Sequence, residues 1–127
     1  RQMCKETGIE VAPGVHANGE FTLGENIADH GGLQVSYQAF KKATAAAPLK
    51  IENGFTPEQR FFLSYANVWA GNIRPEEILK RTKTDPHSLG KWRVDGALPQ
   101  IGAWYEAFNI TEKDPMYLPV DKRVSIW

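Results

Sequence analysis

The sequence has one cysteine, no excess of charge of either sign and no long hydrophobic run, and each absence excludes a class of protein. Cys4 alone cannot form an internal disulfide bond, and no cysteine and histidine cluster has zinc-finger spacing. The 15 Lys and Arg residues balance the 15 Asp and Glu residues, so composition gives no reason to expect nucleic acid or an anionic membrane as a partner. A single cysteine does not distinguish an oxidising from a reducing compartment.

No segment approaches the roughly 20 apolar residues that span a bilayer, and the N-terminal residues lack the hydrophobic core of a signal peptide. The chain begins on Arg1 without an initiator methionine, so we expect it to be cut from a longer protein. Its 127 residues, 42% hydrophobic and 24% charged, are enough to fold as one compact unit around a single core.

The hydrophobic pattern predicts a mainly α fold. The strongest helix start is at Thr56, which would cap a helix with Pro57 at its first position and Gln59 completing a capping box. The helix that follows is apolar almost all round, so we expect it at the centre of the core. Four further helices are predicted, from near Leu23 to Ala43, Pro75 to Lys83, Leu89 to Leu98 and Pro99 to Phe108.

Turn signals divide these helices. The Asn18–Gly19 step predicts a tight turn with short extended arms, after a connector that contains Pro13–Gly14. A second turn is predicted at Asn53–Gly54. The proline steps Asp114–Pro115 and Leu118–Pro119 predict an irregular tail.

The stretch Thr22–Leu33 places carboxylates inside an apolar segment. If a helix starts near Leu23, Glu25 and Asp29 lie four residues apart on one face. Unpaired burial of such groups costs on the order of several kcal/mol, so they need a cation, a protonation shift or a histidine partner. A metal site would supply this, with Glu25 as a ligand and Asp29 orienting a ligating histidine.

Two more features bear on this stretch. Two glycines in a helix, Gly31 and Gly32, predict the close approach of another backbone or helix, because each costs roughly 1 kcal/mol relative to alanine. The competing interpretation of Glu25 is a capping box in which Thr22 caps the helix and Glu25 reaches back to it. On spacing alone, the capping interpretation is favoured.

The motif Glu-Asn-Ile-Ala-Asp at Glu25 to Asp29 resembles the third-ligand motif of the neprilysin and endothelin-converting-enzyme family of zinc metallopeptidases. The resemblance implies that Glu25 binds zinc and that Asp29 supports a histidine ligand. In that family a His-Glu-x-x-His helix supplies two histidine ligands and the general base. The three histidines of this chain, His16, His30 and His87, are too scattered to form it, so we expect these groups in sequence outside the chain. His30 stands where the family usually has asparagine.

Residues 83–94 resemble the family segment Lys-Thr-Asp-x-His-Ser-Pro-Gly-x-Phe-Arg, with Leu89 and Trp92 in place of its proline and phenylalanine. The resemblance implies that His87 stabilises the tetrahedral oxyanion of the cut peptide bond and that Arg93 binds a substrate backbone carbonyl. Without the resemblance, a loop histidine and a helix arginine are more often solvated or structural.

Residues 59–75 resemble the family helix Phe-Phe-Leu-x-x-Ala-x-x-Trp-Cys-Gly-x-x-Arg-Pro. The resemblance implies that Val68 and Trp69 line the hydrophobic subsite for the residue after the cut bond, and the alternative is core packing. Ala70 and Val124 stand where animal members place cysteines, so the chain is more similar to a bacterial member.

Together, the resemblances imply that residues 1–127 are the C-terminal part of a thermolysin-like zinc-peptidase catalytic domain, with Trp127 as the natural C-terminus. The implied parent protein is an endopeptidase that uses Zn²⁺ to hydrolyse peptide bonds in oligopeptides, outside the cytoplasm. Its implied partners are peptide substrates and the missing N-terminal portion, and this chain alone is expected to be inactive.

Two alternatives from other classes stay open at this point. One is a non-catalytic helical module in which Trp69, Trp92 and Trp104 form a peptide-binding groove. The other is a structural helical domain, which would be favoured if Glu25 and Asp29 were solvent-exposed.

Overall fold

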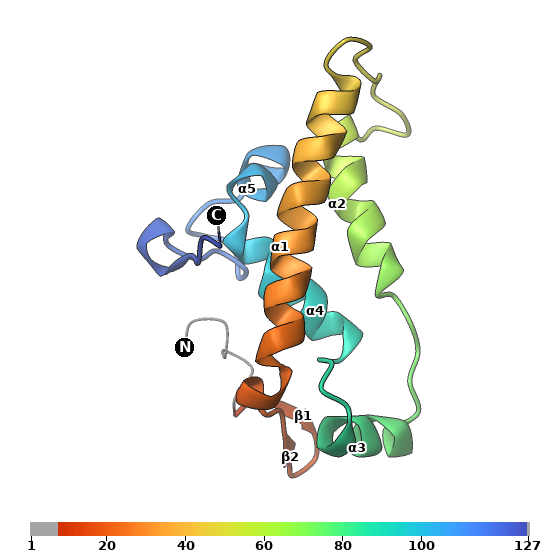
Figure 1. Cartoon of the computed structure of the whole chain (residues 1–127), viewed down its shortest axis with the longest axis vertical. Helices are drawn as coiled ribbons and strands as arrows, with labels where there is room; N and C mark the ends of the chain where they lie inside the picture. Colours follow the sequence, from red (N-terminus) through yellow and green to blue (C-terminus); the bar gives the residue numbers. More distant parts are fainter. Residues whose placement is uncertain (1–7, 127) are drawn as a thin grey trace.

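The computed structural model describes residues 8–126 and is mainly helical, as predicted (Figure 1). Cys4 and Trp127 lie outside the described residues. In Figure 1, α2 runs beside the upper half of the long helix α1, and a β-hairpin and α3 lie at its lower end. The elements are β1 (Glu10–Ala12), β2 (Val15–His16), α1 (Gly19–Thr44), α2 (Pro57–Val68), α3 (Pro75–Thr84), α4 (Gly90–Ala97), the 3₁₀ turn η2 (Leu98–Gln100), α5 (Gly102–Phe108) and the 3₁₀ turn η3 (Val120–Lys122).

Helix α1 begins at Gly19 rather than near Leu23, because Asn18 caps it. The side-chain oxygen of Asn18 accepts a hydrogen bond from the backbone N–H of Phe21 at 3.2 Å, which satisfies one of the free amides of the first turn. Thr22 therefore lies inside the helix and does not cap it. The predicted capping box of Thr22 and Glu25 is wrong, and the competing interpretation of Glu25 loses its basis.

The N-terminal turn forms at the Pro13–Gly14 turn signal and not at the Asn18–Gly19 step. The antiparallel strands β1 and β2 are joined through Pro13 and Gly14, and Gly14 has a φ of +72° that favours glycine. The side chain of Glu10 accepts a hydrogen bond from the N–H of Gly14 at 2.8 Å. Asn18 is used as a helix cap, so the turn predicted at Asn18–Gly19 does not form. The second predicted turn is confirmed, with Asn53 at a φ of +51°.

Helix α2 starts as predicted but is less buried than predicted. Thr56 and Gln59 form the capping box, with hydrogen bonds of 3.2 and 2.9 Å between each side chain and the other's backbone N–H. Only Phe62 is fully buried, whereas Leu63 and Val68 are 41% and 69% exposed. Helix α5 packs against α2, and the rings of Tyr37 and Phe40 on α1 lie against Phe61 and Phe62.

The core lies between α1, α2, α4 and α5. Pro99 belongs to the 3₁₀ turn η2, so the last helix begins at Gly102 and not at Pro99 as predicted. Trp104 is only 6% exposed, so it packs in the core and cannot line a groove with Trp69 and Trp92. The buried apolar side chains are Leu33, Phe62, Ala97, Leu98, Ile101, Trp104 and Tyr105.

His30 is fully buried on the side of α1 that faces this core. Neither ring nitrogen has a hydrogen-bond partner among residues 8–126. Burial lowers the pKa of the imidazole below its ordinary value, because the charged ring is poorly solvated there. The folded chain therefore favours neutral His30.

We expect His30 to make the folded protein less stable as the pH falls from 7.5 to 5. The pKa of His30 in the folded state lies below the unfolded value of about 6.5, so the unfolded state binds more protons in this pH range. The free energy of unfolding therefore decreases as the pH decreases. The decrease in Tm between pH 7.5 and 5 should be smaller in a His30→Asn variant of the intact protein. An equal decrease in both proteins would contradict this prediction.

The carboxylates do not obscure this test, because Asp95, whose pKa burial raises, is present in both proteins and affects their stability alike. Hydrogen bonds lower the pKa values of Glu58, Glu77 and Asp85 in the folded protein. These three carboxylates therefore contribute fully to stability at any pH above their pKa values in the unfolded state, which are about 4 to 4.5. This contribution is lost only as the pH falls further, below the range of the comparison.

Candidate active site

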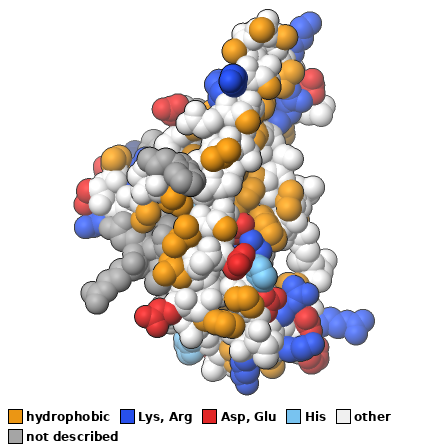
Figure 2. Space-filling view, viewed as in Figure 1, with side chains coloured by type: hydrophobic (Ala, Val, Ile, Leu, Met, Phe, Trp, Pro, Cys, Tyr) orange, Lys and Arg blue, Asp and Glu red, His pale blue; other side chains and the backbone are white. Residues whose placement is uncertain are grey.

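The predicted site residues meet along one side of α1. Glu25 and Asp29 lie one turn apart on α1, the loop between α3 and α4 brings His87 to Glu25, and α4 brings Arg93 to Asp29. The distance from His87 Nε2 to Glu25 Oε2 is 3.3 Å. Figure 2 shows an acidic and a histidine side chain next to each other on the surface of this face. Glu25 is about half exposed, at 42%, whereas Asp29 is 12% exposed.

His87 is oriented by Asp85, which the sequence argument did not single out. Asp85 Oδ1 lies 2.6 Å from His87 Nδ1 and also accepts a hydrogen bond from the backbone N–H of His87 at 3.0 Å. These hydrogen bonds hold the pKa of the Asp85 carboxyl below its ordinary value. The local signal was an aspartate two residues before the histidine, a spacing at which Asp side chains often bond to nearby backbone.

The imidazole of His87 thus lies between two carboxylates. Nδ1 faces Asp85 and Nε2 faces Glu25. Since an ionised carboxylate only accepts hydrogen bonds, the doubly protonated ring is the form that can donate at both ends. In this form Nε2–H is a charge-assisted donor directed at the carboxylate of Glu25.

Arg93 is fixed by a bidentate ion pair. Its Nε and Nη2 donate to the two carboxylate oxygens of Asp29 at 2.5 and 2.7 Å, and this pairing raises the pKa of the guanidinium. The ring of Trp69 covers the guanidinium, with Cζ 3.8 Å from the ring centroid. No described residue accepts a hydrogen bond from Nη1. The sequence predicted only that Asp29 would orient a histidine, so its pairing with Arg93 is a finding of the structure.

Two residues that the sequence argument missed bring α2 and α4 together at Arg93. The hydroxyl of Tyr65 donates to the backbone carbonyl of Arg93 at 3.0 Å, and burial together with the charge of Asp29 raises the pKa of Tyr65 to about 12. A Cβ added at Gly90 would lie 2.5 Å from the carbonyl oxygen of Trp69, so only glycine allows this approach. The close approach predicted at Gly32 is not seen, since an added Cβ there meets no described atom within 4 Å.

The residues predicted to line the hydrophobic subsite lie at the end of α2. Val68 is mostly exposed, and Trp69 is half-buried beneath Arg93. Trp69 also lines a pocket of about 480 Å³ that Gly90, Lys91 and Trp92 border, whereas Val68 does not line it. The indole of Trp69 therefore contacts the guanidinium of Arg93 and also lines this open pocket.

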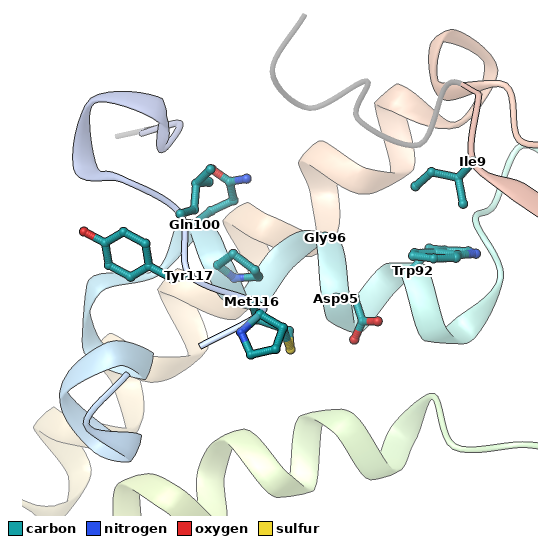
Figure 3. Close-up of a pocket in the computed structure, with 10 residues that line it drawn as sticks. Ile9, Trp92, Asp95, Gly96, Gln100, Met116 and Tyr117 are labelled. Carbon is teal, nitrogen blue, oxygen red and sulfur yellow. The ribbon is translucent and has the colours of Figure 1, made fainter. Parts of the chain in front are cut away.

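A second hollow of about 310 Å³ lies between α4, η2 and the C-terminal tail (Figure 3). Trp92 lies at one end and Met116 and Tyr117 lie toward the other, with Asp95 between them. Burial raises the pKa of the Asp95 carboxyl. None of the predicted site residues lines this hollow, so it is separate from the candidate site.

The described residues fit a zinc ion only in part. No three His, Cys, Asp or Glu side chains in the range 8–126 gather into a group that would hold a metal. Catalytic zinc usually takes three protein ligands and keeps one position open. The accessible carboxylate of Glu25 suits one of these ligands, while Asp85 and Asp29 are occupied by His87 and Arg93. This part of the chain therefore offers one ligand and needs others.

Comparison with known proteins shows the family to which the chain belongs. The profile of Peptidase family M13 matches residues 2–124. Human neprilysin is 38% identical over 121 residues, which cover 93% of this chain and 16% of neprilysin. Bovine endothelin-converting enzyme 1 is 38% identical over 117 residues, which cover 90% of this chain and 16% of that enzyme.

A solved structure shows the same fold. The zinc metalloprotease Zmp1 of Mycobacterium tuberculosis, in complex with an inhibitor, superposes with a TM-score of 0.90 at 32% identity. The match covers 99% of this chain and 20% of Zmp1. The chain spans about a sixth to a fifth of the length of these relatives. From its profile, its relatives and its fold, the chain belongs to peptidase family M13 and corresponds to the C-terminal region of that family.

Proposed function

We propose that this chain is the C-terminal part of the catalytic domain of a zinc-dependent endopeptidase that hydrolyses peptide bonds in oligopeptides. The observation that carries the proposal is the meeting of Glu25 and His87, 3.3 Å apart, with Arg93 held one turn further along α1. A carboxylate ligand, an imidazole donor and a fixed guanidinium on one face suit the cleavage of an amide. The matched structure is named a zinc metalloprotease, which supports the same chemistry.

In this proposal Glu25 is the zinc ligand that the chain contributes. Two histidine ligands and the general base come from the rest of the protein. Zinc, when bound, acts as a Lewis acid that polarises the scissile carbonyl. The half-exposed carboxylate of Glu25 needs no rearrangement to serve as a ligand, because within the described residues it faces only the ring of His87.

His87 stabilises the negative charge that develops on the carbonyl oxygen. Its Nε2 lies 3.3 Å from Oε2 of Glu25, and Asp85 holds the ring at Nδ1. A donor aimed at developing charge is worth roughly 3 to 4 kcal/mol in the transition state. Orientation by Asp85 places this donor before the substrate binds.

Arg93 holds the substrate backbone. Asp29 and Trp69 fix the guanidinium, and Nη1 is directed to no described acceptor, so it suits a peptide carbonyl. Val68 and Trp69 contribute to a hydrophobic subsite for the residue after the cut bond. Because Asp29 uses one lone pair on each oxygen for Arg93, it retains the capacity to accept from a histidine ligand as well.

The proposal extends to partners and location. Peptides are the substrates, the missing N-terminal portion completes the site, and the parent protein acts outside the cytoplasm. Within residues 8–126, no helix has the length and apolar character needed to cross a bilayer.

The proposal is tested with the intact protein and an internally quenched oligopeptide. We expect hydrolysis that stops when a chelator removes zinc and returns when zinc is added, whereas the 127-residue chain alone should be inactive. Hydrolysis that continues after the metal is removed would exclude the zinc mechanism. Tight peptide binding without hydrolysis by the zinc-loaded protein would favour the non-catalytic binding module.

A further inference from the structure

A line of buried polar side chains joins α1 to the loop that carries His87. Ser88 Oγ donates to Asn26 Oδ1 at 2.9 Å, and Asn26 Nδ2 donates to Thr22 Oγ1 at 3.3 Å. Thr22 Oγ1 in turn donates to the carbonyl of Asn18 at 3.3 Å. Thr22, Asn26 and Ser88 are only 7 to 8% exposed. Buried polar groups are costly unless hydrogen-bonded, so these contacts fix the loop on the helix.

The two residues that form this contact are the sequence neighbours of the two site residues. Asn26 follows Glu25, and Ser88 follows His87. The side chains of Glu25 and His87 are 42% and 45% exposed, so their own contact is open to water and easily exchanged. The buried bond between their neighbours is therefore better suited to set the distance between them.

The hydrogen bonds of Asp85 do a different task. They run from Asp85 to His87, two residues away within the same loop. They orient the imidazole relative to its own backbone and leave the position of the loop on α1 undetermined. Ser88 makes a buried contact to α1, the helix that carries Glu25, and the hydrogen bonds of Asp85 to His87 do not provide such a contact.

We propose that Asn26 and Ser88 form a latch that positions His87 relative to Glu25, and that the latch acts on turnover through His87 without touching the substrate. The inference rests on the proposed function of His87 as the oxyanion donor. Such a donor must lie about 2.7–3.1 Å from the oxyanion, and a misplacement of about 1 Å costs on the order of a hundredfold in rate. Asn26 and Ser88 are positioning residues, so substitution of either residue should change kcat.

The test is Ser88→Ala in the intact protein. We expect kcat to fall about tenfold, with KM and zinc content within about twofold of wild type, since a supporting residue commonly contributes about 10- to 100-fold. Thr44→Val is the matched control, because it removes a hydroxyl that bonds to the carbonyl of Phe40 at the far end of α1. The control should keep wild-type kcat. Ser88→Thr keeps the hydroxyl and should retain most of the activity.

A double-mutant cycle separates positioning from general stabilisation. In a His87→Ala background, Ser88→Ala should change kcat by less than about twofold, because the residue through which it acts is gone. A second tenfold loss in that background would overturn the latch, as would an unchanged kcat, a loss of zinc, or failure of Ser88→Ala to fold.

The outcomes that count against the proposed function are different. A zinc-loaded wild-type protein that cleaves no peptide, or a His87→Ala variant with unchanged kcat, would remove the oxyanion role itself. The latch inference would fall with it.

Discussion

In the intact protein, Glu25→Gln is expected to lose nearly all bound zinc and, with it, peptide hydrolysis. The substitution keeps the size of the side chain and removes the negative charge that a zinc ligand provides. Glu25 is half exposed, and the contact that the described residues show for it is with the exposed side chain of His87, so the variant should fold normally. Loss of a residue that only supports a ligand weakens zinc binding by about 10- to 100-fold, and loss of a ligand should exceed this.

The measurement is zinc content by atomic absorption after dialysis, with Glu20→Gln as the matched control. Glu20 is an exposed acid in the first turn of the same helix, so its change removes the same charge away from the site. Asp29→Ala gives an informative comparison. It should weaken zinc binding less than Glu25→Gln but should also raise KM, because it releases Arg93. Equal zinc content in wild type and Glu25→Gln would remove Glu25 from the ligands.

Local sequence signals predicted those parts of the fold that depend on neighbouring residues. The capping box of Thr56 and Gln59 forms as predicted, because its hydrogen bonds join residues three apart. Helix α3 is located within a residue of its predicted end for the same reason. At the N-terminus the local signals competed, since both Asn18 and Thr22 are suitable caps, and the structure uses Asn18.

The parts of the fold and of the candidate site that local signals did not predict depend on contacts between distant segments. The apolar pattern of α2 predicted a central helix, yet Leu63 and Val68 on this helix are 41% and 69% exposed. The pair of Arg93 with Asp29 and the latch of Ser88 with Asn26 join residues 64 and 62 positions apart, and no local pattern encodes them. The resemblance to a family selected the candidate site residues, and the structure shows that Glu25 lies near His87 and that Asp29 pairs with Arg93.

His87→Ala in the intact protein is expected to lower kcat by on the order of a hundredfold or more while KM and zinc content stay nearly unchanged. A group that stabilises only the developing oxyanion contributes to the transition state and not to the bound substrate. Loss of one such donor typically costs about 10²- to 10³-fold in kcat. The side chain of His87 is 45% exposed, so its removal leaves no cavity in the core and should not unfold the protein.

The matched control is His16→Ala, which removes an exposed histidine from β2, outside the candidate site. Steady-state kinetics should give wild-type kcat and KM for this control. A fall in zinc content in His87→Ala would instead show that the ring supports Glu25 as a ligand, through the 3.3 Å contact between them. A wild-type kcat in zinc-loaded, folded His87→Ala would return His87 to a purely structural role, with Asp85 as no more than its hydrogen-bond partner.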